Sequence, residues 1–173
     1  MNTVRYDVIV LGLGAMGAAT CMELARRGLA VLGLEQFTAS HDRGSSPGQS
    51  RVIRKAYFED PRYVPMVRRS LDLWRELEAD VGQTLLHPAG CLNIGPEDHV
   101  AIRGVQRSVA EHALAHELLS ADEIERRWPV FKCQSDDIAV YEADAGVLLP
   151  ERCVAAFLEI AGRCGAELRF ESR

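Results

Sequence analysis

Hydrophobic and polar positions follow two different periods along the first 35 residues. The run from Tyr6 to Leu11 is apolar and β-branched, which is typical of a buried parallel strand. From Ala15 to Arg27 apolar residues recur at helical spacing, and Gly28 is of a residue type that ends helices. A second apolar run over residues 29–34 ends in Glu35. This pattern predicts a strand–helix–strand unit with a right-handed crossover.

The rest of the chain is expected to mix helices with short strands. Residues 36–50 show no periodicity and indicate a loop. Helices are expected over residues 63–81, 100–116 and 150–164, and a further helix is expected from Ser120, which opens a capping box. Strands are expected at 85–86 and 91–94, on either side of a turn at 88–90. Further strands are expected at 138–142, 147–149 and 166–170. No helix follows the last strand to cover it, so we expect a segment cut from a longer fold.

Three glycines occupy the junction between the first strand and the first helix. Gly12, Gly14 and Gly17 form a G-x-G-x-x-G pattern, in which the first allows a tight turn. The second lets a pyrophosphate approach the backbone, and the third lets the helix pack closely on the strand. Glu35 ends the second strand, where a carboxylate can accept hydrogen bonds from an adenosine ribose. The pattern therefore predicts a dinucleotide site, to which Ala15, Met16 and Gln36 also contribute.

The fingerprint does not choose between NAD and FAD. The residues Gly-Leu-Gly-Ala-Met-Gly also resemble the fingerprint of the NAD(P)-dependent β-hydroxyacid dehydrogenases. A non-catalytic dinucleotide-binding module is a further alternative. After Glu35, however, the next convincing parallel strand begins only at Ala166. Such a long excursion between the second and third strands favours a flavoprotein oxidase.

Two arginines follow a loop rich in glycine and serine. Arg51 and Arg54 are three positions apart, so they share a face on a helical turn but point apart on a strand. On a shared face they form a site suited to a carboxylate or to a reduced ring. The alternative is two surface arginines that pair with Glu59 and Asp60. Spacing alone leaves both interpretations open.

The run from Gly44 to Tyr57 resembles a segment of the monomeric sarcosine oxidase family, which includes N-methyltryptophan oxidase and pipecolate oxidase. Residues 62–65, 127–129 and 144–148 resemble further segments of that family, in the same order. The resemblance implies an α/β fold: an incomplete Rossmann-like FAD-binding domain with part of an α+β substrate domain inserted. The expected segments are 1–60 and 144–173 for the FAD-binding domain and 61–143 for the substrate domain.

The same resemblance implies an FAD-dependent oxidase that uses O2 to convert a secondary amine (sarcosine, another N-methyl amino acid or pipecolate) into an imine and hydrogen peroxide. By position, Arg54 would bind the substrate carboxylate and Arg51 would lie against the flavin. The resemblance also assigns cofactor contacts to Gly44, Ser45, Ser46 and Val52. Pro47 departs from the family, which commonly has histidine there, and this puts the substrate in doubt more than FAD binding.

Family members are about twice as long as this chain. The resemblance therefore implies an N-terminal portion, with weak FAD binding and little turnover in isolation. The cysteine that attaches the flavin in the family has no counterpart among the five cysteines here.

Composition narrows the range of partners and locations. The net charge of −5 disfavours nucleic acid and anionic membranes. The apolar stretch from Val8 to Met22 is too short for a membrane span. The cysteines are odd in number and dispersed, which favours a reducing, cytoplasmic location over a disulfide framework. His112 and His116 have the spacing of a helical metal site, but they lack further ligands and indicate surface histidines.

Overall fold

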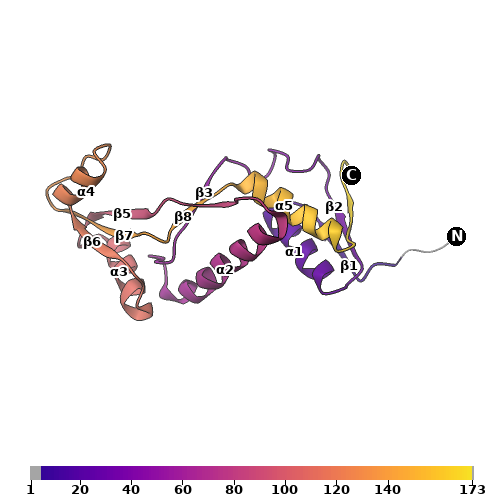
Figure 1. Cartoon of the computed structure of the whole chain (residues 1–173), viewed down its shortest axis with the longest axis horizontal. Helices are drawn as coiled ribbons and strands as arrows, with labels where there is room; N and C mark the ends of the chain where they lie inside the picture. The colour runs from indigo at the N-terminus through magenta and orange to yellow at the C-terminus, as the bar shows by residue number, and fades with distance from the viewer. Residues whose placement is uncertain (1–4, 173) are drawn as a thin grey trace. The chain divides into compact units, whose positions relative to one another are not determined.

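The computed structural model describes residues 5–172, which form a mixed α/β fold that divides into two units (Figure 1). The first unit comprises Met1–Arg51, Glu76–Leu85 and Leu148–Arg173, and the second comprises Val52–Arg75 and Leu86–Val147. Compared with the three segments expected from the sequence, residues 76–85 fall in the first unit, and residues 52–60 and 144–147 fall in the second. In the first unit, the carboxylate of Asp80 pairs with Arg26, and its carbonyl oxygen accepts a hydrogen bond from Arg163 at 3.1 Å.

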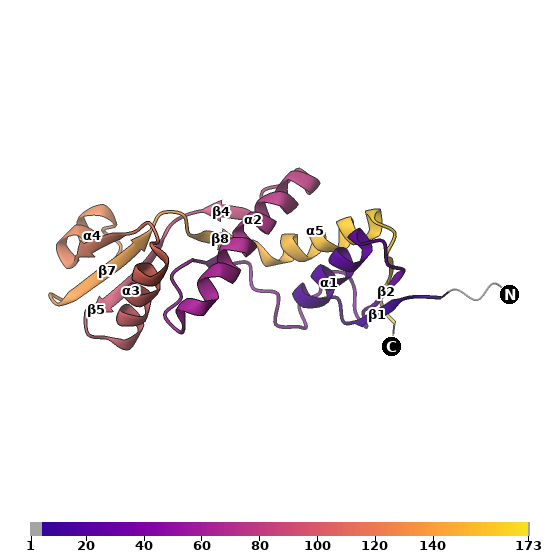
Figure 2. The ribbon, with the colours of Figure 1, turned by 90° about the horizontal axis from the view of Figure 1, so that it is seen from below.

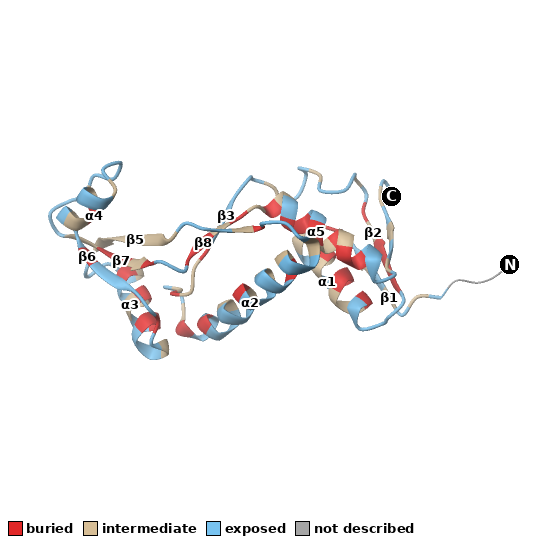
Figure 3. Cartoon of the chain, in the orientation of Figure 1, coloured by how far each residue is buried: buried red, intermediate tan, exposed pale blue. Residues whose placement is uncertain are grey.

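The first unit is built on a parallel sheet of three strands. These are β1 (Val8–Leu11), β2 (Val31–Leu34) and β9 (Glu167–Arg169), in the order β1-β2-β9. Helices α1 (Ala15–Arg26) and α5 (Pro150–Arg163) pack side by side, and their contact contains many of the buried positions in Figure 3. The predicted strand–helix–strand unit and the late third parallel strand are both confirmed.

The second unit contains an antiparallel sheet with two helices packed on it (Figure 2). Its strands are β5 (Cys91–Pro96), β7 (Asp137–Glu142) and β6 (Glu117–Ser120), in the order β5-β7-β6. Helix α3 (Val100–His112) packs against β5 and β7, and α4 (Ala121–Arg127) packs against β6 and β7. Ala56, Val64, Val105, Val109, Leu114 and Val140 form one core cluster of this unit.

The remaining elements are one long helix, the short turn before it and three short strands. A short turn η1 (Pro61–Tyr63) leads into α2 (Val64–Val81). A third sheet has the strand order β3-β8-β4, formed by β3 (Arg51–Ile53), β8 (Gly146–Leu148) and β4 (Leu86–Pro88). Within residues 5–172, no helix has both the length and the apolarity needed to cross a bilayer.

Several local expectations are refined by the structure. The strands on either side of residues 88–90 belong to different sheets, because the N–H groups of Ala89 and Gly90 both donate to the carbonyl oxygen of Ala145. The helix expected to reach residue 116 ends at His112, since Ala113 adopts a left-handed φ of 46°. Strand β6, which the sequence did not predict, follows. The capping box at Ser120 and Glu123 is confirmed.

Candidate nucleotide site and arginine site

The glycine turn between β1 and α1 has the conformation that its spacing predicts. Gly12 adopts a φ of +86°, a region that favours glycine. A Cβ at Gly17 would lie 1.8 Å from the carbonyl oxygen of Gly12, so only glycine lets the helix start this close to the strand. Gly14 is the N-cap of α1, and a Cβ there would meet the Ser46 hydroxyl oxygen at 3.3 Å. The turn and packing roles of the first and third glycines are confirmed.

Glu35 is buried directly beside this turn, with 5% of its surface exposed. Its Oε2 accepts a hydrogen bond from the N–H of Leu13 at 2.8 Å, and its Oε1 accepts one from the N–H of Phe37 at 3.1 Å. Burial by itself would raise the pKa of Glu35, but these bonds and the neighbouring His41 outweigh it and hold the pKa below its ordinary value. Glu35 therefore presents an anion at the end of β2.

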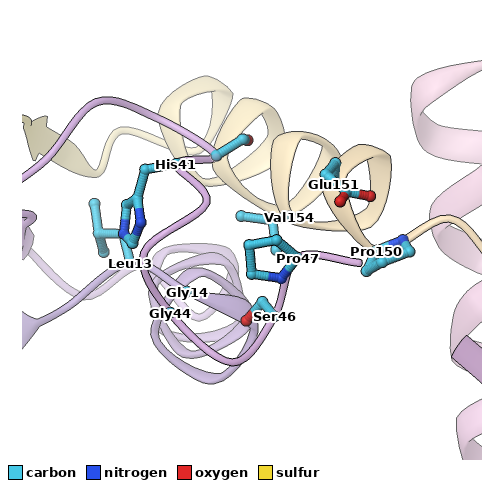
Figure 4. Close-up of a pocket in the computed structure, with 10 residues that line it drawn as sticks. Leu13, Gly14, His41, Gly44, Ser46, Pro47, Pro150, Glu151 and Val154 are labelled. Atoms are coloured by element: carbon cyan, nitrogen blue, oxygen red, sulfur yellow. The ribbon is translucent and has the colours of Figure 1, made fainter. Parts of the chain in front are cut away.

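The loop that carries the predicted cofactor-lining residues folds over the start of α1. The hydroxyl oxygen of Ser46 accepts a hydrogen bond from the N–H of Ala15 at 3.0 Å. A pocket lies here, lined on one side by Gly14, Gly44, Ser46 and Pro47 and on the α5 side by Glu151 and Val154 (Figure 4). The structure thus brings the glycine turn and the loop together around one pocket.

The remaining predicted cofactor residues are all exposed. Met16 is 84% exposed on the first turn of α1, and Gln36 is exposed directly after Glu35. Ser45 is exposed on the loop and contributes its carbonyl oxygen to the contacts of Arg51. Val52, which is 58% exposed, belongs to the second unit.

Arg51 holds the loop through its guanidinium group. Its Nη2 donates to the carbonyl oxygens of Ser45, Ser46 and Pro47 at 3.0, 3.2 and 2.8 Å. Its Nη1 donates to the carbonyl oxygen of Ser50 at 2.7 Å. The side chain therefore binds four main-chain carbonyl oxygens within residues 45–50, and much of its hydrogen-bonding capacity is used within the loop.

Arg54, in the second unit, differs from Arg51 in its hydrogen bonding. Its Nε is buried and has no hydrogen-bond partner among residues 5–172. Its guanidinium carbon lies 4.9 Å from the ring centre of Tyr57 and 6.0 Å from that of Phe58. A guanidinium stacked on aromatic rings with a buried, unsatisfied N–H is suited to bind a carboxylate in a bidentate manner.

The chain around the two arginines is a strand and not a helical turn. Residues 51–53 form β3, so the helical alternative, on which the side chains share a face, is wrong. Among residues 5–172, the Asp60 carboxylate accepts hydrogen bonds from the main-chain N–H and the guanidinium group of Arg62, in place of the pairing with Arg51 or Arg54 in the alternative interpretation. Arg51 belongs to the first unit and Arg54 to the second.

Two carboxylates that sequence reasoning missed bind the main chain next to these arginines. Glu151, in the first turn of α5, accepts hydrogen bonds from the N–H groups of Gly48 and Gln49. Glu142, the last residue of β7, accepts hydrogen bonds from the N–H groups of Lys55 and Ala56. A single acidic residue at the start of a helix or the end of a strand carries no sequence signal that distinguishes it from a surface charge.

The residues described here contain no group of three or more His, Cys, Asp or Glu side chains able to hold a metal ion. His112 ends α3, and a ring nitrogen of His116 lies 2.9 Å from the carbonyl oxygen of Leu114 beyond that helix. The two histidines are therefore not one turn apart on a helix.

Comparison with known proteins places the chain among flavoenzymes. The family model described as DAO, FAD dependent oxidoreductase, matches residues 7–173. The chain is 48% identical over 166 residues to the monomeric sarcosine oxidase of Streptomyces avermitilis, covering 96% of this chain and 43% of the relative. It is 35% identical over 165 residues to the N-methyl-L-tryptophan oxidase of Yersinia pestis, covering 95% and 44%. The chain thus spans less than half the length of these curated relatives.

Solved structures show the same fold. NikD, an unusual amino acid oxidase essential for nikkomycin biosynthesis, matches with a TM-score of 0.86 at 32% identity, over 98% of this chain and 44% of that chain. The glycine oxidase of Geobacillus kaustophilus matches with a TM-score of 0.79 at 23% identity, over 98% of this chain and 47% of that chain, which is a likeness of fold.

Proposed function

We propose that this chain, which belongs to the DAO family of FAD-dependent oxidoreductases, supplies the cofactor cradle and the substrate-binding arginine of an oxidase of secondary amines. Family membership confirms the predicted resemblance, the α/β fold class and FAD as the cofactor of the family. It also favours FAD over the NAD(P)-dependent alternative. The activity, substrate and products of the whole protein are parts of the proposal.

The residues of the glycine turn fit the adenosine and pyrophosphate part of FAD. Gly12 and Gly17 bring the α1 N-terminus against β1, and the absence of a side chain at Gly14 lets a phosphate approach the main chain. Glu35 is held as an anion at the end of β2, where a ribose hydroxyl can donate to it. Gly44, Ser45 and Ser46 belong to the loop that closes on this turn, and Arg51 holds that loop.

The observation that carries the proposal is the buried and unsatisfied Nε of Arg54. A carboxylate bound by this guanidinium would satisfy that donor, and it would orient the amine end of an amino acid substrate. Tyr57 and Phe58 restrict the guanidinium by stacking, so less conformational entropy is lost on binding. These features favour an N-alkyl amino acid over an amine that lacks a carboxylate.

Further parts of the proposal concern the reaction and its location. When bound, FAD supplies the acceptor for the hydride equivalent that leaves the carbon beside the amine nitrogen. The positive charge of Arg51 favours negative charge on the cofactor, and O2 takes up the two electrons to give hydrogen peroxide beside the imine product. The five free cysteines are in keeping with a cytoplasmic location.

Cofactor binding is tested by reconstituting the complete gene product with excess FAD and measuring the flavin absorbance that coelutes in gel filtration. We expect Gly14→Ala to lose flavin while it remains folded, because the new Cβ fills the space that a phosphate needs. Gly162→Ala is the matched control, since a Cβ there meets nothing within 4 Å. Absence of flavin from the unsubstituted protein contradicts the proposal.

Catalysis is tested by following peroxide production from sarcosine and from sarcosinamide, whose carboxylate is replaced by an amide. We expect Arg54→Met to raise the KM for sarcosine by at least about tenfold and to leave the KM for sarcosinamide within about twofold. Arg103→Met, an exposed position on α3, is the control. A flavin-loaded protein that oxidises neither compound nor other N-methyl amino acids supports the alternative of a non-catalytic module.

A further inference from the structure

Glu142 is one of the few charged residues buried in this chain, with 2% of its surface exposed. Its Oε2 accepts hydrogen bonds from the N–H of Lys55 at 3.0 Å and from the N–H of Ala56 at 3.1 Å. Its Oε1 lies 3.2 Å from the N–H of Ala56. A buried carboxylate is costly unless it is hydrogen-bonded, and here the compensating donors are two consecutive main-chain N–H groups.

These N–H groups come directly after Arg54. The ammonium group of Lys55 is not directed toward Glu142, because it pairs with Asp144 at 2.7 Å. Glu142 therefore acts on the main chain of this segment, and the adjacent Ala56 is fully buried in the core of the second unit. The main chain is thus fixed at Lys55 and Ala56, the two residues that follow Arg54.

Helix α3 holds the same segment at its following residues. The hydroxyl group of Ser108 donates a hydrogen bond to the carbonyl oxygen of Tyr57. A Cβ at Gly104 would lie 2.1 Å from the carbonyl oxygen of Phe58, so this part of the helix packs directly on main chain. The two rings under the Arg54 guanidinium therefore project from a segment that is restrained by both β7 and α3.

We propose that Glu142 is a positioning residue for Arg54: it fixes the turn at residues 55–56 so that the guanidinium stays stacked on Tyr57 and Phe58 and presents its unsatisfied Nε–H to a substrate carboxylate. The inference rests on the proposed role of Arg54 in substrate binding. Glu142 does not touch the substrate; it reduces the number of orientations that the arginine can adopt before binding.

Three substitutions separate positioning from simple stabilisation. Glu142→Ala removes the acceptor of both N–H groups. Glu142→Gln keeps one carbonyl oxygen able to accept both bonds, and it replaces the charge and the second acceptor oxygen with a neutral NH2 group. Asp144→Asn removes a carboxylate that contacts the Lys55 side chain and leaves the main-chain bonds intact, so it is the matched control.

The kinetic test uses the complete gene product loaded with FAD. We expect Glu142→Ala to raise the KM for sarcosine by at least about tenfold with a smaller change in the KM for sarcosinamide, since only the former needs the oriented arginine. Glu142→Gln should restore most of the loss, and Asp144→Asn should behave as the unsubstituted protein.

A second measurement does not depend on turnover. Hydrogen exchange at the amides of Lys55 and Ala56 should accelerate in Glu142→Ala and stay slow in Glu142→Gln. The thiol of Cys91, opposite Glu142 in the β5–β7 pairing, supplies another probe. Burial and then the charge of Glu142 raise the pKa of Cys91, whereas Arg54 lowers it. Alkylation of Cys91 should therefore become faster in Glu142→Gln.

The outcomes distinguish the two levels of the proposal. If Arg54→Met impairs sarcosine oxidation but Glu142→Ala folds and leaves the KM for sarcosine within about twofold, the positioning role is wrong and the proposed function stands. If Arg54→Met has no effect either, the role of Arg54 fails and that of Glu142 fails with it. If Glu142→Ala does not fold, the test uses Glu142→Gln in its place. Fast hydrogen exchange at the amides of Lys55 and Ala56 in folded Glu142→Gln would then overturn the inference.

Discussion

The carboxylate of Glu151 on α5 accepts a hydrogen bond from the main-chain N–H of Gly48 at 2.9 Å. The same oxygen accepts a second bond from the N–H of Gln49 at 3.1 Å. Both loop residues have positive φ values, 141° for Gly48 and 64° for Gln49, and the latter is uncommon outside glycine. The helix carboxylate and the Arg51 guanidinium therefore hold residues 45–50 in a conformation that this loop alone does not favour.

Replacing Glu151 should loosen this loop without unfolding the first unit. In Glu151→Ala, we expect hydrogen exchange at Gly48 and Gln49 to accelerate by about fivefold or more, since each amide loses its acceptor. Glu159→Ala, which removes a carboxylate paired with Arg163 on the same helix, serves as the control. Equal exchange rates in the two variants would rule out this role of Glu151.

The same contact predicts a pH dependence. The hydrogen bonds from Gly48 and Gln49 lower the pKa of Glu151 from the ordinary value of 4.5, so they favour the anion. Their contribution to folded-state stability is fully present above pH 4.5 and is lost as the pH falls through the lower folded-state pKa. The NMR shift of the Gly48 amide should follow that titration. A shift that titrates equally in Glu151→Gln contradicts the assignment.

Close packing at the glycine turn predicts a large stability difference between two glycine substitutions. In Gly17→Ala the new Cβ would lie 1.8 Å from a main-chain oxygen, so we expect a loss of at least about 2 kcal/mol in the free energy of unfolding. Gly162→Ala lies on α5 with open space around it and should instead gain about 0.5–1 kcal/mol. Urea unfolding measures both. Similar stabilities for the two variants would refute the close approach.

Glu35 should stabilise the fold independently of any ligand. Glu35→Ala leaves the N–H of Leu13 without its acceptor, and we expect a loss of about 1–3 kcal/mol in the free energy of unfolding. Glu35→Gln keeps one acceptor and should lose less. Because the pKa of Glu35 is lowered, its ionic contribution is present above its ordinary value of 4.5 and declines at lower pH. A denaturation series from pH 7 to pH 3 tests this, with Glu35→Gln as the reference that lacks the dependence.

The free cysteines should differ strongly in reactivity. Cys164 is exposed directly after α5, whereas Cys153 is buried within that helix and its pKa is raised to about 11, first of all by burial. We expect an alkylating reagent at neutral pH to modify Cys164 rapidly and Cys153 only on unfolding. Mass spectrometry of the folded protein measures the order. Labelling of Cys153 at the rate of Cys164 would show that α5 is not packed as described.

Most of the parallel sheet and of α1 in the first unit could be predicted, because the period of apolar residues and the glycines that mark these elements lie close together in the sequence. The crossover from β1 through α1 to β2 follows from the change of period and from the glycines that surround it. Strand β9 also follows from a short apolar run after Gly165. By contrast, β3 (RVI) and β6 (ELLS) contain only two adjacent apolar residues each, which is too few for a recognisable period.

The candidate site also contains residues that the sequence identifies and features that only the structure shows. The glycine turn, Glu35, the loop and both arginines are recognisable from residue types and order, and the family is recognisable from them. The different states of the arginines are not, because Arg51 is satisfied by loop carbonyl oxygens while a buried donor of Arg54 has no partner in the described chain. Glu142 and Glu151 were missed for a related reason: a carboxylate that binds main-chain N–H groups has no complementary side chain to reveal it.

The amino-acid sequence by itself determined the class of fold, the nucleotide fingerprint and the family, since each depends on residue types at short, regular separations. Only the tertiary structure decided how distant segments combine into two units, and which charged groups remain available for a ligand. Those outcomes depend on hydrogen bonds between residues a hundred or more positions apart, such as Gly48 and Glu151, and spacing along the chain does not encode them.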